Sequence, residues 1–202
     1  MSRALYLLNL IYHWDMMAFK VFSSGSASVT LARLAKVVSF SGDGYLYLAT
    51  PIFLLVFDFS QVPEFVQIAI SAFAAERLIY AAIKNGLKRR RPANIVSNYQ
   101  SVIEAGDEFS FPSGHASAAF LMASLLVLFY GPVFAIFYLW AGSVALSRLV
   151  LGVHFPTDVL VGSFLGSSIA YLSFVQLLWD CSTVFRALAT GTSLEPSQCQ
   201  KR

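Results

Sequence analysis

A histidine followed four residues later by an aspartate is the strongest chemical signal in this 202-residue chain. A carboxylate at the spacing of Asp158 can orient the imidazole of His154, fix its tautomer and leave its second nitrogen free as a nucleophile. Arg148 lies six residues before His154, and its planar fork of N–H groups can bind phosphate oxygens. Alone, such an arginine can equally anchor a helix end at a membrane surface. The spacing of the three residues indicates a nucleophilic histidine that acts on phosphorus.

A second short motif, Pro112-Ser113-Gly114-His115, stands directly before a long apolar run. Ser113 is a good helix N-cap, which places Gly114 and His115 in the first helical turn. Free backbone N–H groups and the helix dipole favour a phosphate at that position. An imidazole beside the phosphate can protonate a leaving oxygen. Read alone, the motif is explained equally well by an ordinary cap followed by an interfacial histidine.

Five of the fourteen basic residues fall within residues 84–91, directly before Pro92. If the helix continues to this proline, Lys84, Lys88 and Arg91 lie within about 60° of one another around the axis. The outer two are then roughly 10 Å apart along it, so their side chains can converge on one anion. The proline turns the chain out into a loop. Without the other motifs, the cluster is better explained as an anchor against anionic lipid headgroups.

The elements that position these residues are predicted to be membrane helices. Hydrophobic residues make up 57% of the chain and charged residues 12%, and the mean hydropathy is +0.66, outside the range of soluble domains. Residues 45–57, 109–147 and 159–179 contain no Asp, Glu, Lys or Arg. A bilayer core of about 30 Å needs about 20 apolar residues in a helix, whereas an outer-membrane barrel would alternate apolar and polar positions. The chain is therefore predicted to be all-α, a polytopic membrane helix bundle.

Hydropathy predicts five spanning helices, and the N-terminal region could supply a sixth. The five predicted spans are residues 45–59, 62–83, 113–130, 132–151 and 157–179. Two spans separate the loop that begins at Arg91 from the turn that contains His154, so both emerge on the same side of the membrane. The basic cluster and both histidine motifs are expected to meet there.

We expect one membrane-embedded domain over residues 1–202, with its motifs in residues 84–158. Charged residues interrupt the apolar pattern of residues 1–40, which we therefore expect to form one or two interfacial helices. Residues 180–202 are expected to form a polar, frayed tail.

Composition also excludes some partners and cofactors. Nucleic-acid binding is not expected, because the basic residues gather at one helix end and not along a solvated face. The two cysteines, Cys181 and Cys199, form no pair with metal-ligand spacing, and neither do the eleven acidic residues. No metal and no other cofactor is predicted.

Together the motifs resemble those of the type 2 phosphatidic acid phosphatase superfamily, a group of integral-membrane lipid phosphatases. The matching positions are Lys84-x6-Arg91-Pro92, Pro112-Ser113-Gly114-His115 and Ser147-Arg148-x5-His154-x3-Asp158. All eleven specified positions match in order, with the expected helix between the second and third motifs. The resemblance is strong over residues 78–162. Members of this family usually have six spans, so the five counted here are a departure in the N-terminal region.

The resemblance implies a role for each matching residue. His154 would attack phosphorus to give a phosphohistidine, with Asp158 orienting it. His115 would protonate the departing lipid oxygen and then activate water. The phosphate oxygens would be held by Lys84, Arg91, Ser113, Gly114 and Arg148. No metal would be needed, because several positive donors neutralise the charge.

The predicted function is hydrolysis of a phosphate monoester or diphosphate on a membrane lipid. The candidate substrates are undecaprenyl diphosphate, phosphatidylglycerophosphate, phosphatidic acid and a lipid A phosphate. One alternative with the same fold is a phosphotransferase that passes the phosphoryl group to another lipid. Another is a non-catalytic protein that only binds a lipid headgroup, but binding alone requires no carboxylate-oriented histidine. The soluble vanadate-dependent haloperoxidases of the same superfamily do not fit the hydropathy.

Three further expectations concern charges and sidedness. Arg77 and its neighbour Glu76 lie inside an apolar helix, where they either support the site residues or pair with another helix, or else contact the substrate. Asp107 is either a solvated loop charge or a group that positions its loop near the basic cluster. A plain count of basic residues places the site in the cytoplasm. The resemblance implies instead the extracytoplasmic face of a bacterial inner membrane, and we adopt that prediction because phosphate-binding cations are poor reporters of insertion.

Overall fold

The computed structural model describes residues 3–24, 29–57, 59–97 and 99–189, with side chains described over residues 10–21, 29–57, 59–97 and 99–179. These described residues form helices and no strand, which confirms the predicted fold class. The chain order is α1 (Arg3–Ser24), α2 (Val29–Ser41), α3 (Tyr45–Val56), α4 (Val62–Leu87), η1 (Pro92–Asn94), α5 (Gly114–Tyr130), η2 (Pro132–Ile136), α6 (Phe137–Val150) and α7 (Pro156–Ala189).

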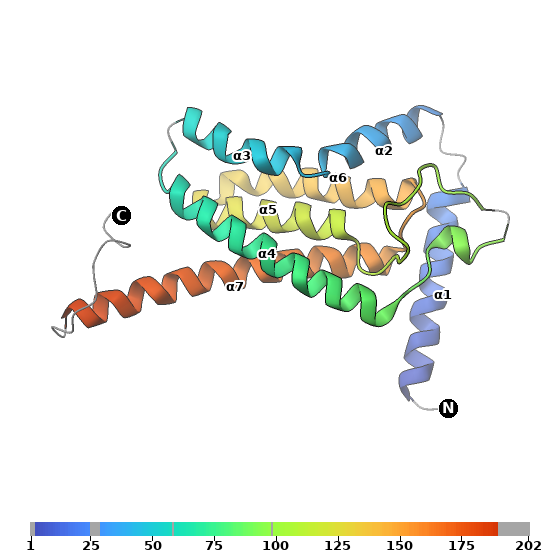
Figure 1. Cartoon of the computed structure of the whole chain (residues 1–202). Coiled ribbons are helices and arrows are strands. Elements are labelled where there is room, and N and C mark those ends of the chain that lie inside the picture. Colours follow the sequence, from blue (N-terminus) through green and yellow to red (C-terminus); the bar gives the residue numbers. More distant parts are fainter. Residues whose placement is uncertain (1–2, 25–28, 58, 98, 190–202) are drawn as a thin grey trace.

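All five predicted spans are helical, but they differ in length. Three stretches are long and apolar enough to cross a membrane, namely Val62–Leu87, Pro132–Val150 and Pro156–Trp179. The other two, α3 with 12 residues and α5 with 17, are shorter apolar helices. α3 contains Pro51, and a turn containing Gly44 separates it from α2. Figure 1 shows α2 and α3 following one another along α6.

The N-terminal helices take two different positions. α2 buries Ala35 and Ser39, and its Ser39 reaches Arg148 of α6, so one face of α2 packs within the bundle. α1 runs across the end of the bundle, beside the loop that follows α4 (Figure 1). Of its described side chains, residues 10–21, Asp15 and Phe19 are buried. The Phe19 ring packs edge-on against Phe155, with 5.5 Å between the ring centroids. The interfacial position of residues 1–40 stays a prediction.

α5 is the central helix, and ten of its 17 residues are buried. A helix that is apolar on all sides is expected to be surrounded by other helices. α7 approaches it closely through two glycines. A Cβ added at Gly162 would lie 2.4 Å from the Ser113 carbonyl oxygen, and one at Gly166 would lie 1.9 Å from that of Ser117. The small side chains at these positions therefore allow helix contact at backbone distance.

The end of α7 differs from the predicted tail. The helix continues to Ala189, ten residues into the segment expected to fray, because residues 180–189 contain no glycine or proline to end it. The remainder of that predicted tail, residues 190–202, lies outside the described residues.

Candidate active site

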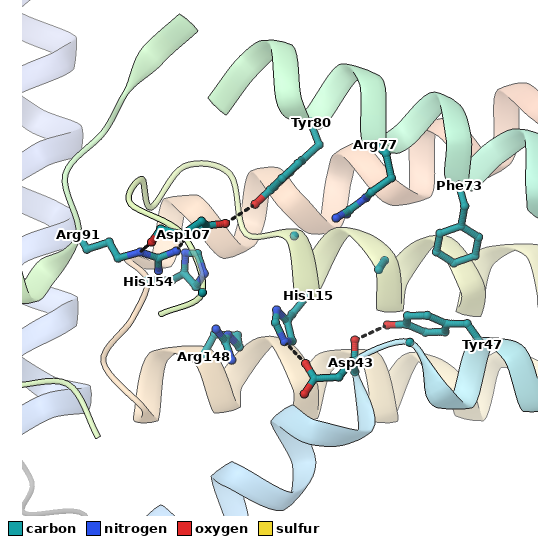
Figure 2. A pocket seen from close by; sticks show the side chains of 15 residues that line it. Asp43, Tyr47, Phe73, Arg77, Tyr80, Arg91, Asp107, His115, Arg148 and His154 are labelled. Carbon is teal, nitrogen blue, oxygen red and sulfur yellow. Dashed lines mark hydrogen bonds and ion pairs between the residues drawn. The ribbon is translucent and has the colours of Figure 1, made fainter. Parts of the chain in front are cut away.

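The motifs meet in one cavity of about 390 Å³, which lies between α4, the turn from α2 to α3, the start of α5 and the end of α6. Five of the eight predicted site residues line it: His154, His115, Arg91, Arg148 and Gly114. Figure 2 shows the two histidines and the two arginines facing the same space from different elements. The other three, Lys84, Ser113 and Asp158, are buried beside it. The structure thus brings together residues that lie up to 74 positions apart in the sequence, from Lys84 to Asp158.

His154 lies in the tight turn between α6 and α7. Gly152 in that turn has φ +72°, and a Cβ there would lie 1.6 Å from the Tyr99 hydroxyl, so the turn requires glycine. His154 Nδ1 donates to the carbonyl oxygen of Ser110 at 2.7 Å. A carbonyl only accepts, so this bond fixes the hydrogen on Nδ1 and leaves Nε2 unprotonated. Nε2 is therefore the nitrogen available for attack.

The protonation of His154 is set mainly by burial. Its side chain is 3% exposed, and burial lowers the pKa of His154 from 6.5 to about 4, although Asp158 opposes the shift. Arg91 and Arg148 add to the lowering. The imidazole is therefore neutral near pH 7, as a nucleophile requires.

Asp158 does not orient His154 in the way that the spacing predicts. Its Oδ2 lies 3.7 Å from His154 Nδ1, beyond hydrogen-bond distance, and accepts instead from the backbone N–H of Phe155 at 2.8 Å. The physical reason is that α7 begins between them. A carboxylate in the first turn of a helix reaches back to the free N–H groups at the helix start. The Ser110 carbonyl then takes the position that the carboxylate was expected to fill.

Arg89 links Asp158 to α1. Its guanidinium donates to Asp158 Oδ1 at 2.7 Å and to Asp15 Oδ2 at 2.5 Å. Asp15 also accepts from the backbone N–H of Thr157 at 3.0 Å and from the Thr157 hydroxyl at 2.5 Å. Both carboxylates are fully buried. Arg89 further covers the Phe155 ring, with 4.4 Å between its guanidinium carbon and the ring centroid. This network holds the turn of His154 from outside the cavity.

His115 has a carboxylate partner that the motifs do not contain. Its Nε2 lies 2.5 Å from Asp43 Oδ1, in the turn between α2 and α3 (Figure 2). That turn is itself held by Tyr47, whose hydroxyl donates to the Gly42 carbonyl. A carboxylate beside an imidazole stabilises its protonated form. Asp43 therefore orients the His115 ring at the cavity wall.

Arg91 and Arg148 line the cavity from separate elements, and Lys84 is buried beside it. Arg148 is buried and donates to the Ser39 hydroxyl at 2.5 Å, while its Nε has no partner among the described residues. Arg91 donates to the Val153 carbonyl at 2.7 Å. Lys84 contacts Tyr80 and Asp107 and does not line the cavity itself. The unpartnered Nε leaves Arg148 able to bind an anion.

Asp107 lies between two of these cations. Its carboxylate accepts from Lys84 and from Arg91, so it positions the loop and is not simply a solvated charge. Burial alone would raise the pKa of Asp107, but the hydrogen bonds from Lys84 and Arg91 outweigh burial and lower it. The carboxylate thus remains ionised between Lys84 and Arg91.

Ser113 is the N-cap residue of α5 and Gly114 its first residue, as predicted, but the Ser113 side chain makes no capping hydrogen bond. Its backbone N–H donates to the Asp158 carbonyl at 2.9 Å, while its buried Oγ has no partner among the described residues. Gly114 lines the cavity, and a Cβ there would lie 3.2 Å from the Tyr80 ring. The small residue therefore keeps the helix start open toward the cavity.

An apolar groove of about 740 Å³ adjoins this cavity between α3 and α4. The two hollows share Asp43, Gly44, Tyr47 and Phe73. Beyond them the groove is lined mostly by apolar side chains of α3 and α4, including Leu48, Phe65 and Ile70. A molecule with a phosphate at one end and a hydrocarbon at the other can therefore occupy both at once.

Sequence reasoning missed Asp15, Asp43 and Arg89 as site residues. Their only signal is that charged side chains are costly in so apolar a chain and therefore need partners. No group of three or more His, Cys, Asp or Glu side chains within the described part of the chain could hold a metal ion.

The fold and the site define an integral membrane protein with a cationic, two-histidine cavity. The model of the PAP2 superfamily matches residues 65–180, more than half of the chain. The chain belongs to the PAP2 superfamily, which confirms the resemblance of its motifs.

Curated relatives are similar over part of their length. The lipid A 4'-phosphatase of Bacteroides thetaiotaomicron is 32% identical over 108 residues, which cover 50% of this chain and 48% of that protein. The undecaprenyl-diphosphatase of Sulfolobus acidocaldarius is 28% identical over 145 residues, 71% of this chain and 69% of that protein. The chain spans about half the length of the first of these relatives.

Two crystal structures have a similar arrangement of helices. Aquifex aeolicus LpxE has a TM-score of 0.67 and 27% identity, covering 78% of this chain and 93% of that one. A PAP2-type phosphatidylglycerolphosphate phosphatase from Bacillus subtilis has a TM-score of 0.64 and 24% identity, covering 82% of this chain and 85% of that one. The second likeness concerns the fold alone.

Proposed function

We propose that this protein is a metal-independent lipid phosphatase that cleaves a phosphate monoester or diphosphate through a phosphohistidine on His154. One observation carries the proposal. His154 lines the cavity with its Nδ1 hydrogen bonded to a carbonyl, which leaves Nε2 as a neutral nucleophile beside Arg91 and Arg148. The names of the relatives, which are phosphatases of lipid A and undecaprenyl diphosphate, support the reaction class.

The reaction would run in two steps. His154 Nε2 attacks phosphorus, and the bond from phosphorus to the lipid oxygen breaks as His115 protonates that oxygen. Water activated by His115 then attacks the phosphohistidine, which releases inorganic phosphate and restores both histidines. Arg148, Arg91 and the start of α5 at Gly114 stabilise the charge on the phosphate oxygens during both steps.

The substrate is proposed to be a membrane lipid because an apolar groove continues from the phosphate cavity. The groove and the cavity meet at Tyr47 and Phe73, so the hydrocarbon lies between α3 and α4 when the phosphate reaches His154. Undecaprenyl diphosphate, phosphatidylglycerophosphate, phosphatidic acid and lipid A phosphate all have this shape. The site is proposed to open at the extracytoplasmic face of a bacterial inner membrane.

The experiment that tests this function is release of inorganic phosphate from these four lipids by the detergent-purified protein. We expect hydrolysis of at least one lipid, survival of the activity in EDTA, and inhibition by vanadate, which adopts the geometry of the phosphoryl transfer. Loss of activity in EDTA with recovery in magnesium would contradict the metal-independent reaction. Phosphate release distinguishes a hydrolase from a phosphotransferase, which would give a newly phosphorylated lipid instead.

The His154→Ala variant distinguishes an enzyme from a protein that only binds lipid headgroups. A protein that only binds headgroups would release no phosphate, and its lipid binding would depend on the arginines and not on His154. Retention of full phosphate release by His154→Ala would overturn the nucleophile assignment.

A further inference from the structure

Arg77 is a cation of the cavity that the proposed reaction does not use. It lies on α4 and its guanidinium points into the cavity between Tyr80 and Phe73 (Figure 2). Its side chain is 51% exposed, whereas that of its neighbour Glu76 is fully buried. The two form a two-pronged pair, with Nε to Oε2 at 2.5 Å and Nη2 to Oε1 at 2.7 Å. Glu76 therefore fixes the direction in which Arg77 points.

The ion pair with Glu76 leaves N–H groups of Arg77 available for another acceptor. A guanidinium has five N–H groups, and Glu76 accepts two of them. The Tyr80 ring lies against the guanidinium, with 4.6 Å from its carbon to the ring centroid, and restricts it further. An oriented guanidinium with available N–H groups at the wall of a cavity is well suited to bind an oxyanion.

The position of Arg77 along α4 sets what it can contact. Lys84, which contacts the phosphate-facing Asp107, lies seven residues further on, about 10 Å along the helix. Phe73 lies one turn before Arg77 and lines both the cavity and the apolar groove. Arg77 thus stands between the end of the cavity where phosphate reacts and the groove that takes the hydrocarbon.

We propose that Arg77 binds a second phosphate placed between the reacting phosphate and the hydrocarbon of the substrate. This inference rests on the proposed function and narrows its substrate class to lipids with two phosphates in series. The second phosphate is joined to the first either directly, as in a polyprenyl diphosphate, or through glycerol, as in phosphatidylglycerophosphate. A lipid with one phosphate would place only neutral ester or ether oxygens beside Arg77.

For a diphosphate the reaction balances with one water. His154 attacks the terminal phosphorus, the bond from that phosphorus to the bridging oxygen breaks, and the oxygen leaves with the lipid phosphate. Arg77 would neutralise the charge that develops on this leaving phosphate. Hydrolysis of the phosphohistidine then gives inorganic phosphate, so the products are lipid monophosphate and inorganic phosphate.

A purely structural role for the pair makes a different prediction. If Arg77 only neutralised the buried Glu76, its removal would weaken the protein for every substrate alike. A neutral pair of apolar residues would cost less in a membrane helix than this ion pair. The measurement that separates the two roles is therefore whether the loss of kcat/KM differs between two-phosphate and one-phosphate lipids.

The experiment compares lipids with two phosphates in series with lipids that have one. The first pair is farnesyl diphosphate with farnesyl phosphate, which differ by one phosphate. The second is phosphatidylglycerophosphate with phosphatidic acid, which differ by one glycerol phosphate. Because Arg77→Gln alone would leave Glu76 buried without its cation, the variants are the double Glu76→Gln/Arg77→Gln and the single Arg77→Lys. Arg33→Gln, at an exposed arginine of α2 away from the cavity lining, is the matched control. The measurement is kcat/KM for each lipid, with affinity for a farnesyl methylenediphosphonate and a farnesyl phosphonate as a second readout.

We expect the double variant to lower kcat/KM for a two-phosphate lipid about 10- to 100-fold more than for its one-phosphate partner. The pair of lipids that shows this selective loss identifies whether Arg77 binds a directly linked or a glycerol-linked second phosphate. An equal loss for both members of each pair would overturn the inference and leave Arg77 a structural residue. If the wild-type protein hydrolyses none of the lipids, the proposed function fails. The affinities then still decide the inference, since Arg77→Lys should weaken binding of the diphosphonate selectively.

Discussion

Asp15 and Asp158 accept hydrogen bonds from one guanidinium, that of Arg89. The first lies in α1 and the second in the first turn of α7. Arg89 therefore links the first helix to the start of the last helix, next to the turn that contains His154. Two fully buried carboxylates share this single cation, together with donors from Thr157 and Phe155. The N-terminal helix is thereby part of the structure that holds His154.

Arg89→Gln is expected to destabilise the protein strongly, because it leaves two buried carboxylates without their cation. Removal of one partner from a buried pair costs about 3–5 kcal/mol. Asp15→Asn should cost less, since it removes one of the two negative charges and keeps the side-chain shape. The measurement is thermal unfolding in detergent, with the exposed neighbour Arg90→Gln as control. Equal unfolding temperatures for Arg89→Gln and Arg90→Gln would show that the network does not stabilise the fold.

Replacement of each histidine by alanine is expected to block a different step of the reaction. His154→Ala should form no phosphoenzyme, whereas His115→Ala should lose turnover by about 10²- to 10⁴-fold and accumulate phosphohistidine from a substrate with a good leaving group. The reason is that only His154 has a nitrogen fixed for attack, while His115 is paired with Asp43. Acid-labile phosphate on each variant after a brief reaction gives the answer. Its presence on His154→Ala would assign the nucleophile elsewhere.

Asp43→Asn should weaken proton donation by His115 without removing it. An amide in place of the carboxylate no longer stabilises the imidazolium, so we expect about a 10-fold lower kcat for a lipid alcohol leaving group. The loss should be smaller for an aryl phosphate, whose leaving oxygen needs less protonation. A loss of the same size for both leaving groups would mean that Asp43 acts only by holding the turn between α2 and α3.

The pH dependence follows from the burial of His154. Its pKa is lowered to about 4 in the folded protein, and attack requires the neutral imidazole. The acid limb that His154 contributes to kcat/KM should therefore lie near pH 4 and not near 6.5. Because the folded state binds fewer protons than the unfolded state between these values, stability should fall as the pH falls from 6.5 toward 4, by at most about 3 kcal/mol. Thermal unfolding of wild type and His154→Gln at pH 7 and pH 4.5 measures this, and an equal loss in both proteins would contradict it.

The sequence predicted four of the residues that line the cavity, because the proposed chemistry needs particular side chains at particular spacings. His154, His115, Arg91 and Arg148 are such residues, and all four line the cavity. The helices could be predicted for a related reason, since a bilayer requires long apolar runs.

The partners of these residues could not be predicted in the same way. The acceptor for His154 is a backbone carbonyl, at Ser110, and every residue has one, so it leaves no trace in the sequence. Asp15 and Asp43 lie far from the motifs along the chain, and their positions follow from how α1 and α2 pack. The hydrogen-bond partner of Asp158 is the Phe155 N–H and not His154, because its distance to the N–H groups at the start of α7 depends on the residue where that helix begins.

The network around Arg89 also bears on which side of the membrane the site faces. Lysines and arginines report insertion only where no other requirement retains them. Lys84, Arg91 and Arg148 belong to the cationic site, and Arg89 is held between two buried carboxylates. The remaining basic residues of that cluster are Lys88 and Arg90, against Arg186, Lys201 and Arg202 beyond the last predicted span. Arg3, Lys20, Arg33 and Lys36 precede the first predicted span, so this count does not decide the side of the membrane. The extracytoplasmic site stays the prediction that the family resemblance implies.

We therefore expect a cysteine at the exposed loop position Glu108 to be reachable from outside the cell. In a background with Cys181 and Cys199 replaced by serine, Glu108→Cys should react with a membrane-impermeant thiol reagent in intact spheroplasts. A reporter that works only in the cytoplasm should be active when fused after Arg202. The matched control is a cysteine at Gln61, in the connection between α3 and α4 at the other end of the bundle, which should react only after lysis. The reverse labelling pattern would place the cavity in the cytoplasm, where the substrate phosphate would have to lie in the inner leaflet.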